Sequence, residues 1–391
     1  MCALRIPLAK VAFGRLEEEA VTRVLRSGWV TQGPEVAAFE REFADFCGAR
    51  HAVAVSNCTV SLHLALLVSG VKPGQEVITV SHSFIATANA IRHCGALPVF
   101  VDIRLDDLNM DPALIEAAIT PKTAAIMLVH QLGMPARSAE IAAIAKRHGL
   151  PLVEDSACAA GSETLDGNQW RRIGAPFDKL SCFSLHPRKL LSTGDGGMIT
   201  TDDADLAARL RLLRQHGMSV NDQQRHQSQQ VVFEEYVEVG FNYRLTDIQA
   251  AIGRCQLARL PQMVVRRREL AEIYRAKLGR IDGVTVPMDR TDTRTNWQSY
   301  CLMLPDGIDQ RQVMQAMLDD GIATRRGVMN THREPAYSRG EESTGVRFPL
   351  PVSEKAQDRG LILPMFDEMT EQDVETVSSS LANALRRQRA H

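Results

Sequence analysis

The most informative segment of the sequence is Ser181-Cys-Phe-Ser-Leu-His-Pro-Arg-Lys189, followed by Leu-Leu-Ser-Thr-Gly-Asp-Gly-Gly197. Phe183 and Leu185 indicate a strand, Pro187 indicates a turn, and the glycines predict a loop that lets backbone approach a ligand. Lys189 therefore stands on a short turn between a strand and a glycine-rich segment. An Arg-Lys pair is usually only a solvated surface feature. The strand, the turn and the glycine-rich segment around Lys189 are what indicate a functional lysine.

About thirty residues upstream, Leu152-Val-Glu-Asp-Ser-Ala157 places an acidic pair at the end of another apolar strand. We expect Asp155 at the rim of the sheet and Glu154 on the opposite face, because successive strand residues alternate. The small residues that follow leave room for a flat ring. A lysine and a carboxylate on neighbouring strand ends suit pyridoxal 5'-phosphate (PLP). The amine forms a Schiff base with the aldehyde, and the carboxylate keeps the ring nitrogen protonated.

Residues 50–200 alternate between strand and helix patterns, which predicts an α/β fold with a mostly parallel central sheet. The expected strands are Ala52–Ser56, Glu76–Val80, Pro98–Val101, Ala124–Val129 and Pro151–Val153. Helices are expected at Thr59–Ser69 and Ala139–His148. Ligands of such sheets bind outside the carboxyl ends of the strands, and Lys189, Asp155, Asn57 and Phe84 all fall there.

The length of 391 residues favours two domains. We expect a large PLP-binding domain at residues 1–255 and a smaller α+β domain at 256–391. The polar residues 219–232 predict a mobile loop, with a merely solvated connection as the alternative. The other expected elements are a helix Arg244–Leu260 interrupted by Pro261, a helix Met263–Leu278, a strand Tyr300–Leu304, and helices Gln310–Asp320 and Glu371–Arg387.

The formal net charge of −2 and the pI of about 6.6 argue against a nucleic-acid-binding or membrane-surface protein. No apolar run approaches a spanning helix, and the first residues lack a signal-peptide core. The eight cysteines are scattered without a Cys-x-x-Cys pair, which is typical of reduced thiols in the cytoplasm. No cluster has metal-ligand spacing, so we expect no metal.

Other residues near the expected strand ends have two interpretations each. Ser56-Asn-Cys-Thr59 precedes a helix, where free N–H groups bind phosphate, or Asn57 or Thr59 simply caps the helix. Ser184 could donate its hydroxyl to the same phosphate. Phe84 could stack on the pyridine ring or belong to the core. His186 could be catalytic, although a turn histidine satisfied by backbone is the commoner case.

Taken together, these motifs resemble the DegT/StrS-type aminotransferases, PLP enzymes that aminate keto sugars, mostly nucleotide-linked ones. The resemblance covers nearly the whole chain. Its segments are Ser27–Pro34, Ser56–Leu66, Phe84–Thr87, Val129–Gly133, Glu154-Asp155, Ser184–Lys189, Gly240–Gly253, Thr324–Gly327 and Leu363-Pro364.

The resemblance implies a fold-type-I homodimer with each active site at the subunit interface. It assigns Lys189 to the Schiff base, Asp155 to the pyridinium partner, Phe84 to ring stacking, and Ser184, Cys58 and Thr59 to the phosphate. It makes Asn242 a ligand of the cofactor phosphate of the other subunit. Many members carry glutamine or histidine at the position of Cys158, near the cofactor 3-hydroxyl. A dehydratase branch replaces the lysine by histidine, and Lys189 excludes that branch.

We therefore predict a PLP-dependent aminotransferase that moves an amino group from an amino acid, L-glutamate by resemblance, to a nucleotide-linked keto-deoxysugar. Such reactions serve surface polysaccharide or natural-product biosynthesis. The candidate substrate-binding residues are Thr31, His186, Arg325, Arg326 and His332, with Arg333 beside them, because arginine forks suit phosphate. The alternatives are an aminotransferase for a free cyclic ketone, such as a keto-inositol, and a non-catalytic regulatory protein of this fold.

Overall fold

The computed structural model describes residues 5–220, 225–226, 228–338 and 346–389 of the chain. Within these ranges, no helix is long and apolar enough to cross a membrane. The cytoplasmic location stays a prediction. Part of the expected loop at residues 219–232, namely residues 221–224 and 227, lies outside the described residues.

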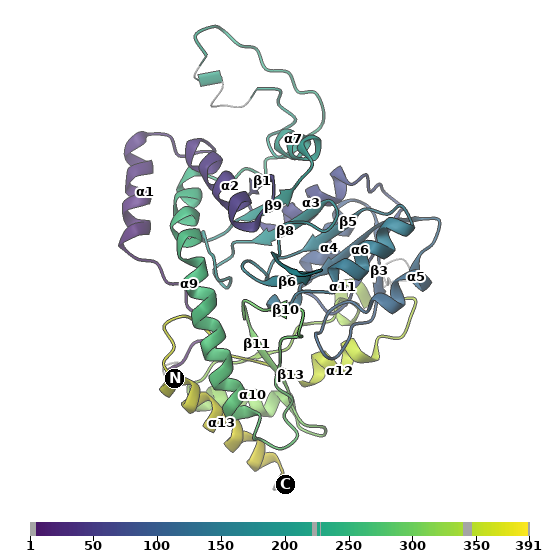
Figure 1. The fold of residues 1–391 in the computed structure, drawn as a ribbon, viewed down its shortest axis with the longest axis vertical. Coiled ribbons are helices and arrows are strands. Elements are labelled where there is room, and N and C mark those ends of the chain that lie inside the picture. The colour runs from purple at the N-terminus through teal and green to yellow at the C-terminus, as the bar shows by residue number, and fades with distance from the viewer. Residues whose placement is uncertain (1–4, 221–224, 227, 339–345, 390–391) are drawn as a thin grey trace.

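A seven-stranded sheet forms the centre of the larger part of the molecule (Figure 1). The strand order is β1-β9-β8-β5-β4-β2-β3, and all neighbours pair in parallel except those of β9, which is antiparallel to β1 and β8. This confirms the predicted mostly parallel α/β sheet. The strands are β1 (His51–Val55), β2 (Glu76–Val80), β3 (Leu97–Val101), β4 (Thr123–Val129), β5 (Leu152–Asp155), β8 (Leu180–Ser184) and β9 (Gly197–Thr201).

Helices cover both faces of this sheet because alternate strand residues are apolar on opposite sides. Val53 and Val55 of β1 pack with α3 (Cys58–Val68), α4 (Ala86–His93) and α7 (Ala204–Leu213). Ala52 and Ala54 face the other side and pack with α2 (Pro34–Cys47) and α9 (Asp247–Leu278). Farther along that second face lie α5 (Ile115–Ala118) and α6 (Ser138–Arg147).

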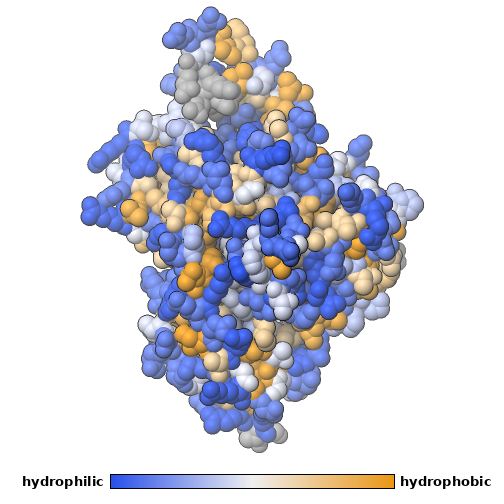
Figure 2. Space-filling view, viewed as in Figure 1, coloured by the Kyte–Doolittle hydropathy of each residue, from blue (hydrophilic) through white to orange (hydrophobic). Residues whose placement is uncertain are grey.

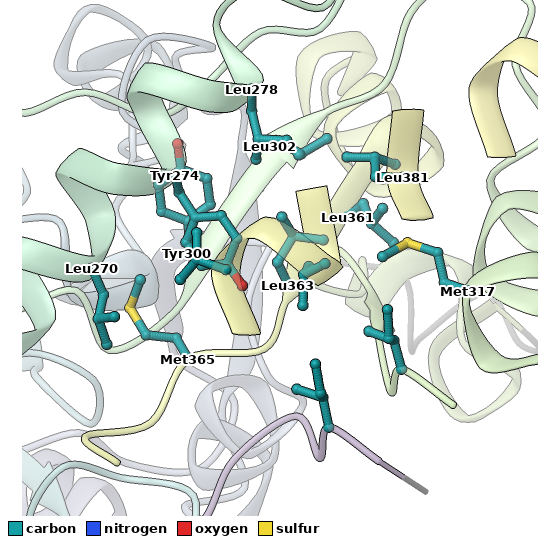
Figure 3. Close-up of a cluster of buried hydrophobic side chains, with 14 of the residues drawn as sticks. Leu270, Tyr274, Leu278, Tyr300, Leu302, Met317, Leu361, Leu363, Met365 and Leu381 are labelled. Carbon is teal, nitrogen blue, oxygen red and sulfur yellow. The ribbon is translucent and has the colours of Figure 1, made fainter. Parts of the chain in front are cut away.

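A second hydrophobic cluster lies below the large sheet, around a small antiparallel sheet of β11 (Tyr300–Met303), β13 (Gly360–Leu363) and β12 (Arg325–Arg326). Figure 3 shows its centre, where Tyr274 of α9 stacks on Tyr300 of β11 at 4.9 Å between ring centroids. Helices α10 (Gln310–Asp319) and α13 (Glu371–Arg389) complete it. Ile6, from the start of the chain, also belongs to this cluster.

Helix α9 corrects one expectation. Pro261 does not end the helix, because α9 runs without interruption through 32 residues and contains it. The first half packs under the large sheet with Leu257 and Leu260, and the second half enters the small cluster with Leu270 and Tyr274. Packing on both sides outweighs the one hydrogen bond that a proline removes. The expected boundary at residue 255 falls inside this helix, so the division into two domains stays a prediction.

The remaining elements are short or peripheral. Helix α1 (Arg15–Ser27) packs on α9, and a third sheet joins β6 (Glu163–Asp166), β7 (Gln169–Arg172) and β10 (Thr293–Arg294). The segment between α7 and α9 projects away from the body at the top of Figure 1. The other short helices are η1 (Pro112–Leu114), η2 (Gln131–Gly133), η3 (Thr331–Arg333), α11 (Pro335–Ser338) and α12 (Pro351–Arg359).

Candidate active site

A cavity of about 530 Å³ opens at the carboxyl ends of β4, β5 and β8, between the large sheet and the small one. This is where an open parallel sheet binds its ligands. The first turns of α3 and α4 and the strands β12 and β13 complete its walls. Nine of the predicted site residues line it: Cys58, Thr59, Phe84, Asp155, Cys158, Ser184, His186, Lys189 and Arg325.

Lys189 reaches the cavity from the turn after β8. Its backbone N–H donates to the carbonyl of His186 at 2.8 Å, which closes the turn that Pro187 predicts. Its Nζ donates to Cys158 Sγ at 3.0 Å. Burial opposes the charged amine, but the neighbouring Cys158, Cys58 and Asp155 together raise the pKa of Lys189 above its ordinary value.

The two carboxylates of β5 point to opposite faces, as the alternation of a strand predicts. Asp155 lines the cavity, and its Oδ2 accepts a hydrogen bond from Thr87 Oγ1 at 2.8 Å. Burial raises the pKa of Asp155. Glu154 lies outside the cavity, where it accepts from His130 Nε2 at 2.9 Å and from the backbone N–H of Phe177 at 2.8 Å. Glu154 is therefore occupied by structural bonds, while Asp155 faces a ligand.

The first turn of α3 borders the cavity beside Lys189 and Ser184. Asn57 caps this helix, and its Oδ1 accepts from the N–H of Val60 at 3.1 Å. A Cβ added at Gly197 would lie 2.4 Å from the carbonyl oxygen of Asn57, so only glycine lets β9 pass this close. Asn57 is thus both a cap and part of a cradle of helix-start N–H groups, which suits phosphate.

Phe84 lines the cavity with its side chain 55 % exposed, so it is not a core residue in this chain. An exposed aromatic face at the rim is available for stacking on a flat ring. His186 also borders the cavity, and its Nδ1 accepts from the backbone N–H of Arg188 at 3.2 Å. The backbone contact expected for a turn histidine is therefore present.

The predicted arginines differ in whether their side chains line the cavity. Arg325 lines the cavity, whereas Arg326, the next residue of β12, points away and donates to Glu334 at 3.1 Å. Arg188 also lines the cavity. Within the described ranges, the guanidinium groups of Arg325 and Arg188 form no hydrogen bond or ion pair. Both remain available to an anion.

His332 and Arg333 lie outside the cavity. His332 Nδ1 lies 2.6 Å from the buried Ser81 Oγ, and its Nε2 lies 3.2 Å from Glu354. Arg333 pairs with Asp358 at 2.6 Å and with Glu354 at 3.4 Å. Their polar groups are occupied by these contacts within one subunit.

Thr31 and Asn242 also lie outside the cavity of a single chain. Thr31 is exposed between α1 and α2, and its carbonyl accepts from the N–H of Asp247 at 3.2 Å. Asn242 is exposed on the segment before α9, and its Oδ1 accepts from Arg244 Nε at 3.1 Å. The helix starts later than expected, because Thr246 caps it and accepts from the N–H of Gln249. Asn242 is therefore not a helix cap.

Three further cavity residues lie close to the predicted site residues, although the sequence motifs assign them no role. Thr87, within the quoted motif Phe84–Thr87, holds Asp155. Arg188 precedes Lys189, and the dipeptide alone gave no reason to separate it from a solvated pair. Gln298 comes from the segment before β11 and contacts the backbone on both sides of Lys189. No local pattern marks Gln298, because only the fold brings it to Lys189.

These residues fit PLP. The cavity offers an amine at Lys189, a buried carboxyl at Asp155, an aromatic face at Phe84 and a helix start with Ser184 beside it. Among the described residues, no group of three or more histidine, cysteine, aspartate or glutamate side chains could hold a metal ion. The fold and this set of groups define the class of PLP-dependent enzymes with a mostly parallel central sheet.

Comparison with known proteins identifies the family. Residues 12–382 match the model of the DegT/DnrJ/EryC1/StrS aminotransferase family. The chain belongs to this family of PLP-dependent aminotransferases, and its cofactor is PLP.

Relatives and solved structures agree along the full length. The spore coat polysaccharide biosynthesis protein SpsC of Bacillus subtilis (strain 168) is 38 % identical over 385 residues, which cover 97 % of both chains. The aminotransferase TlmJ from Streptoalloteichus hindustanus is 34 % identical with a TM-score of 0.88, covering 98 % of this chain and 99 % of that one. DesV of S. venezuelae is also 34 % identical, with a TM-score of 0.84 and coverage of 96 % and 98 %.

Proposed function

We propose that this aminotransferase moves an amino group from an amino acid, L-glutamate, to a nucleotide-linked keto-deoxysugar. One cavity carries this proposal. Lys189 and Asp155 form what we call its floor, and Arg325 and Arg188, whose guanidinium groups have no partner among the described residues, form what we call its opening. PLP, when bound, supplies the electron sink for moving a proton at the substrate carbon. The residues of the floor therefore take part in the reaction, and the arginines of the opening bind the anionic part of the substrate.

At the floor, Lys189 and Asp155 have different tasks. Lys189 Nζ attaches the cofactor and, once displaced by the amino donor, accepts and returns the proton of the reacting carbon as a general base. Asp155 keeps the ring nitrogen protonated, and Thr87 holds its carboxyl in place. The first turn of α3 and Ser184 bind the phosphate, and Phe84 covers the ring.

At the opening, Arg325 and Arg188 are suited to a diphosphate or a carboxylate, because neither guanidinium group has an acidic partner in the part of the chain that the structure describes. The relatives support a sugar substrate by their names. One functions in spore coat polysaccharide biosynthesis, and DesI, 31 % identical with a TM-score of 0.86, was solved in the presence of its TDP-sugar product. We therefore favour a nucleotide diphosphate sugar over a free cyclic ketone.

We further propose that the enzyme is a homodimer with shared active sites. Asn242 does not line the cavity of its own chain, and its neighbours Phe241 and Tyr243 pack against the core of the large sheet at the base of the segment between α7 and α9. This segment exposes Val231, Phe233 and Val239, each at least 85 % accessible. Figure 2 shows hydrophobic residues among hydrophilic ones at the top of the molecule, where the segment projects. A second copy of the chain would cover these side chains and receive Asn242 at its cofactor phosphate.

Cofactor absorbance in a single turnover tests the substrate. The PLP-loaded protein is first treated with excess L-glutamate, freed of it, and then mixed with a panel of keto sugars. A nucleotide-linked keto sugar should return the visible absorbance of the starting enzyme within one turnover. If only a free keto-inositol returns it, the nucleotide-sugar assignment is wrong. If L-glutamate leaves the starting absorbance unchanged while another amino acid bleaches it, the donor assignment is wrong.

A further inference from the structure

The side chain of Gln298 contacts the backbone on both sides of Lys189. Its Nε2 donates to the carbonyl of Arg188 at 2.5 Å, and its Oε1 accepts from the N–H of Leu190 at 3.1 Å. Gln298 is buried, with 8 % of its surface exposed. One carboxamide thus bonds the two peptide groups that flank the lysine, although Gln298 is 109 residues away in sequence.

Gln298 is itself held from the small-sheet side. Its backbone N–H donates to Asn296 Oδ1 at 2.9 Å, and its carbonyl accepts from Arg267 Nη1 at 3.3 Å. Arg267 is a buried residue of α9 that pairs with Asp367 at 2.9 Å. The backbone of the residue whose carboxamide holds the Lys189 turn is therefore fixed by both Asn296 and Arg267.

Asn296 extends this arrangement to the residues that follow Asp155. Its Nδ2 donates to the carbonyls of Cys158 at 2.9 Å and Ala160 at 2.8 Å. Between Asn296 and Gln298 lies Trp297, whose φ of 52° is rare for an aromatic residue and costs conformational free energy. Trp297 stacks on Tyr300, with ring centroids 5.6 Å apart, which helps to keep it there. The strained residue lies between the two side chains that bond the Cys158 carbonyl and the Lys189 turn.

We propose that Gln298 is a positioning residue for Lys189, a proposal that rests on the role of Lys189 as the cofactor-attaching residue. A lysine side chain has four rotatable bonds, so the amine is placed reproducibly only where its backbone is fixed. Gln298 fixes that backbone from both sides, while Asn296 fixes the carbonyl of Cys158, whose thiol contacts Nζ. The cofactor therefore attaches to an amine that is already in place.

A double-mutant cycle on cofactor affinity tests this proposal. The dissociation constant of PLP is measured for the wild-type protein, Gln298→Met, Lys189→Ala and the double variant, by titrating the cofactor-free proteins. Methionine keeps the length of glutamine but forms neither hydrogen bond. Gln298→Met should weaken PLP binding about tenfold when Lys189 is present, because two buried hydrogen bonds are lost. In the Lys189→Ala background the same change should have little further effect.

If Gln298→Met weakened PLP binding equally with and without Lys189, Gln298 would only stabilise the fold. If Gln298→Met did not weaken PLP binding when Lys189 is present, the proposal would also be wrong. Gln298→Glu provides a second variant for the same cycle, because it keeps the acceptor for Leu190 and replaces the donor to Arg188 by a carboxylate oxygen that repels the carbonyl. It should weaken binding by about tenfold or more, again only when Lys189 is present. If Gln298→Met does not fold, the Gln298→Glu cycle decides.

Gln310 offers a matched control, because its Nε2 donates to the carbonyls of Gln357 and Gly360, and none of these three residues lines the cavity. Gln310→Met should lower the melting temperature of the cofactor-free protein without changing PLP affinity. Borohydride reduction of the wild-type holoenzyme, followed by peptide mass spectrometry, checks the premise. An adduct on another lysine overturns the role of Lys189 and this proposal together. An adduct on Lys189 with an uncoupled cycle overturns this proposal alone.

Discussion

The floor and the opening of the cavity are built in contrasting ways. At the floor, Asp155 is bonded to Thr87, Lys189 contacts Cys158, and the Lys189 turn is held by Gln298. At the opening, the side chains of Arg325, Arg188 and Phe84 make no polar contact with the described residues. A preorganised floor suits a reaction common to a whole family. An opening with unpaired groups suits a part of the substrate that differs between members.

The strongest test of the floor is Lys189→Ala, which should abolish steady-state turnover and the covalent attachment of PLP. In the wild-type protein, borohydride should fix the cofactor to Lys189, because its amine is the one that lines the cavity. The measurement is the mass of the peptide that contains the reduced adduct. Full activity in Lys189→Ala would show that the floor has been assigned to the wrong residue.

The next largest effect should separate the two carboxylates of β5. Asp155→Asn should bind PLP but lose about 10²-fold or more in turnover, because an amide cannot keep the ring nitrogen protonated. Glu154→Gln should keep turnover close to that of the wild type and lose stability instead, since Glu154 bonds His130 and the N–H of Phe177. The comparison requires kcat for both variants with PLP bound. Reversed outcomes would move the pyridinium partner to Glu154.

Mixed dimers test whether the cofactor site is completed by a second chain. Lys189→Ala subunits are combined with subunits carrying Asn242→Asp, a change that places a carboxylate against the cofactor phosphate. If Asn242 serves the other subunit, each mixed dimer has one site with both lesions and one with neither. An equal mixture should then regain about a quarter of wild-type activity, because half of the dimers are mixed. If verified mixed dimers stay inactive, Asn242 acts within its own chain.

A smaller effect is expected at the opening. Arg325→Met should raise KM for the keto sugar about tenfold and leave KM for the amino donor nearly unchanged, because an exposed cation–phosphate contact is lost. Binding of the sugar should also weaken with added salt. Arg326→Met is the matched control, since Arg326 pairs with Glu334 outside the cavity. Equal changes in KM for both substrates would show that Arg325 does not distinguish them.

The smallest expected effect is that of Asp155 on the stability of the cofactor-free protein. Burial raises the pKa of Asp155, so its ionised form destabilises the folded protein at pH values above that raised pKa. Asp155→Asn should therefore increase the melting temperature of the cofactor-free protein at neutral pH, by roughly 1 to 3 °C. The difference should shrink as the pH falls through the folded pKa toward the ordinary aspartate value. A lower melting temperature for the variant at neutral pH would contradict this account.

Residues adjacent to strand ends were predictable from the sequence, because strand, turn and helix patterns are local. Asp155 ends β5, Ser184 ends β8 and Lys189 lies on the turn after β8, and the parallel sheet brings these strand ends together. Gln298 was not predictable in this way, because its distance from Lys189 in sequence hides a contact that only packing of the small sheet creates.

The cation cluster illustrates a second limit. Arg325, Arg326, His332 and Arg333 are close in sequence, yet only Arg325 lines the cavity. Neighbours on a strand face opposite ways, and acidic partners such as Glu334 and Glu354 come from segments whose positions depend on the tertiary fold. Pro261 shows the same limit for local structure. Its propensity predicts a break, and burial of α9 on both sides of it overrides that propensity.

Helix α9 also has a mechanical consequence. From Pro261 to Leu278 it extends about 25 Å, at 1.5 Å per residue. The carbonyl of Leu257 lacks its helical donor, because proline has no N–H. Pro261 is therefore the position at which α9 would bend most easily. Each degree of bending at Pro261 displaces Leu278 by about 0.4 Å. Leu363 and Met365 pack with this end of the helix and line the cavity. The continuity of α9 across Pro261 therefore sets where these two cavity residues lie relative to the large sheet, because the same helix packs on both cores.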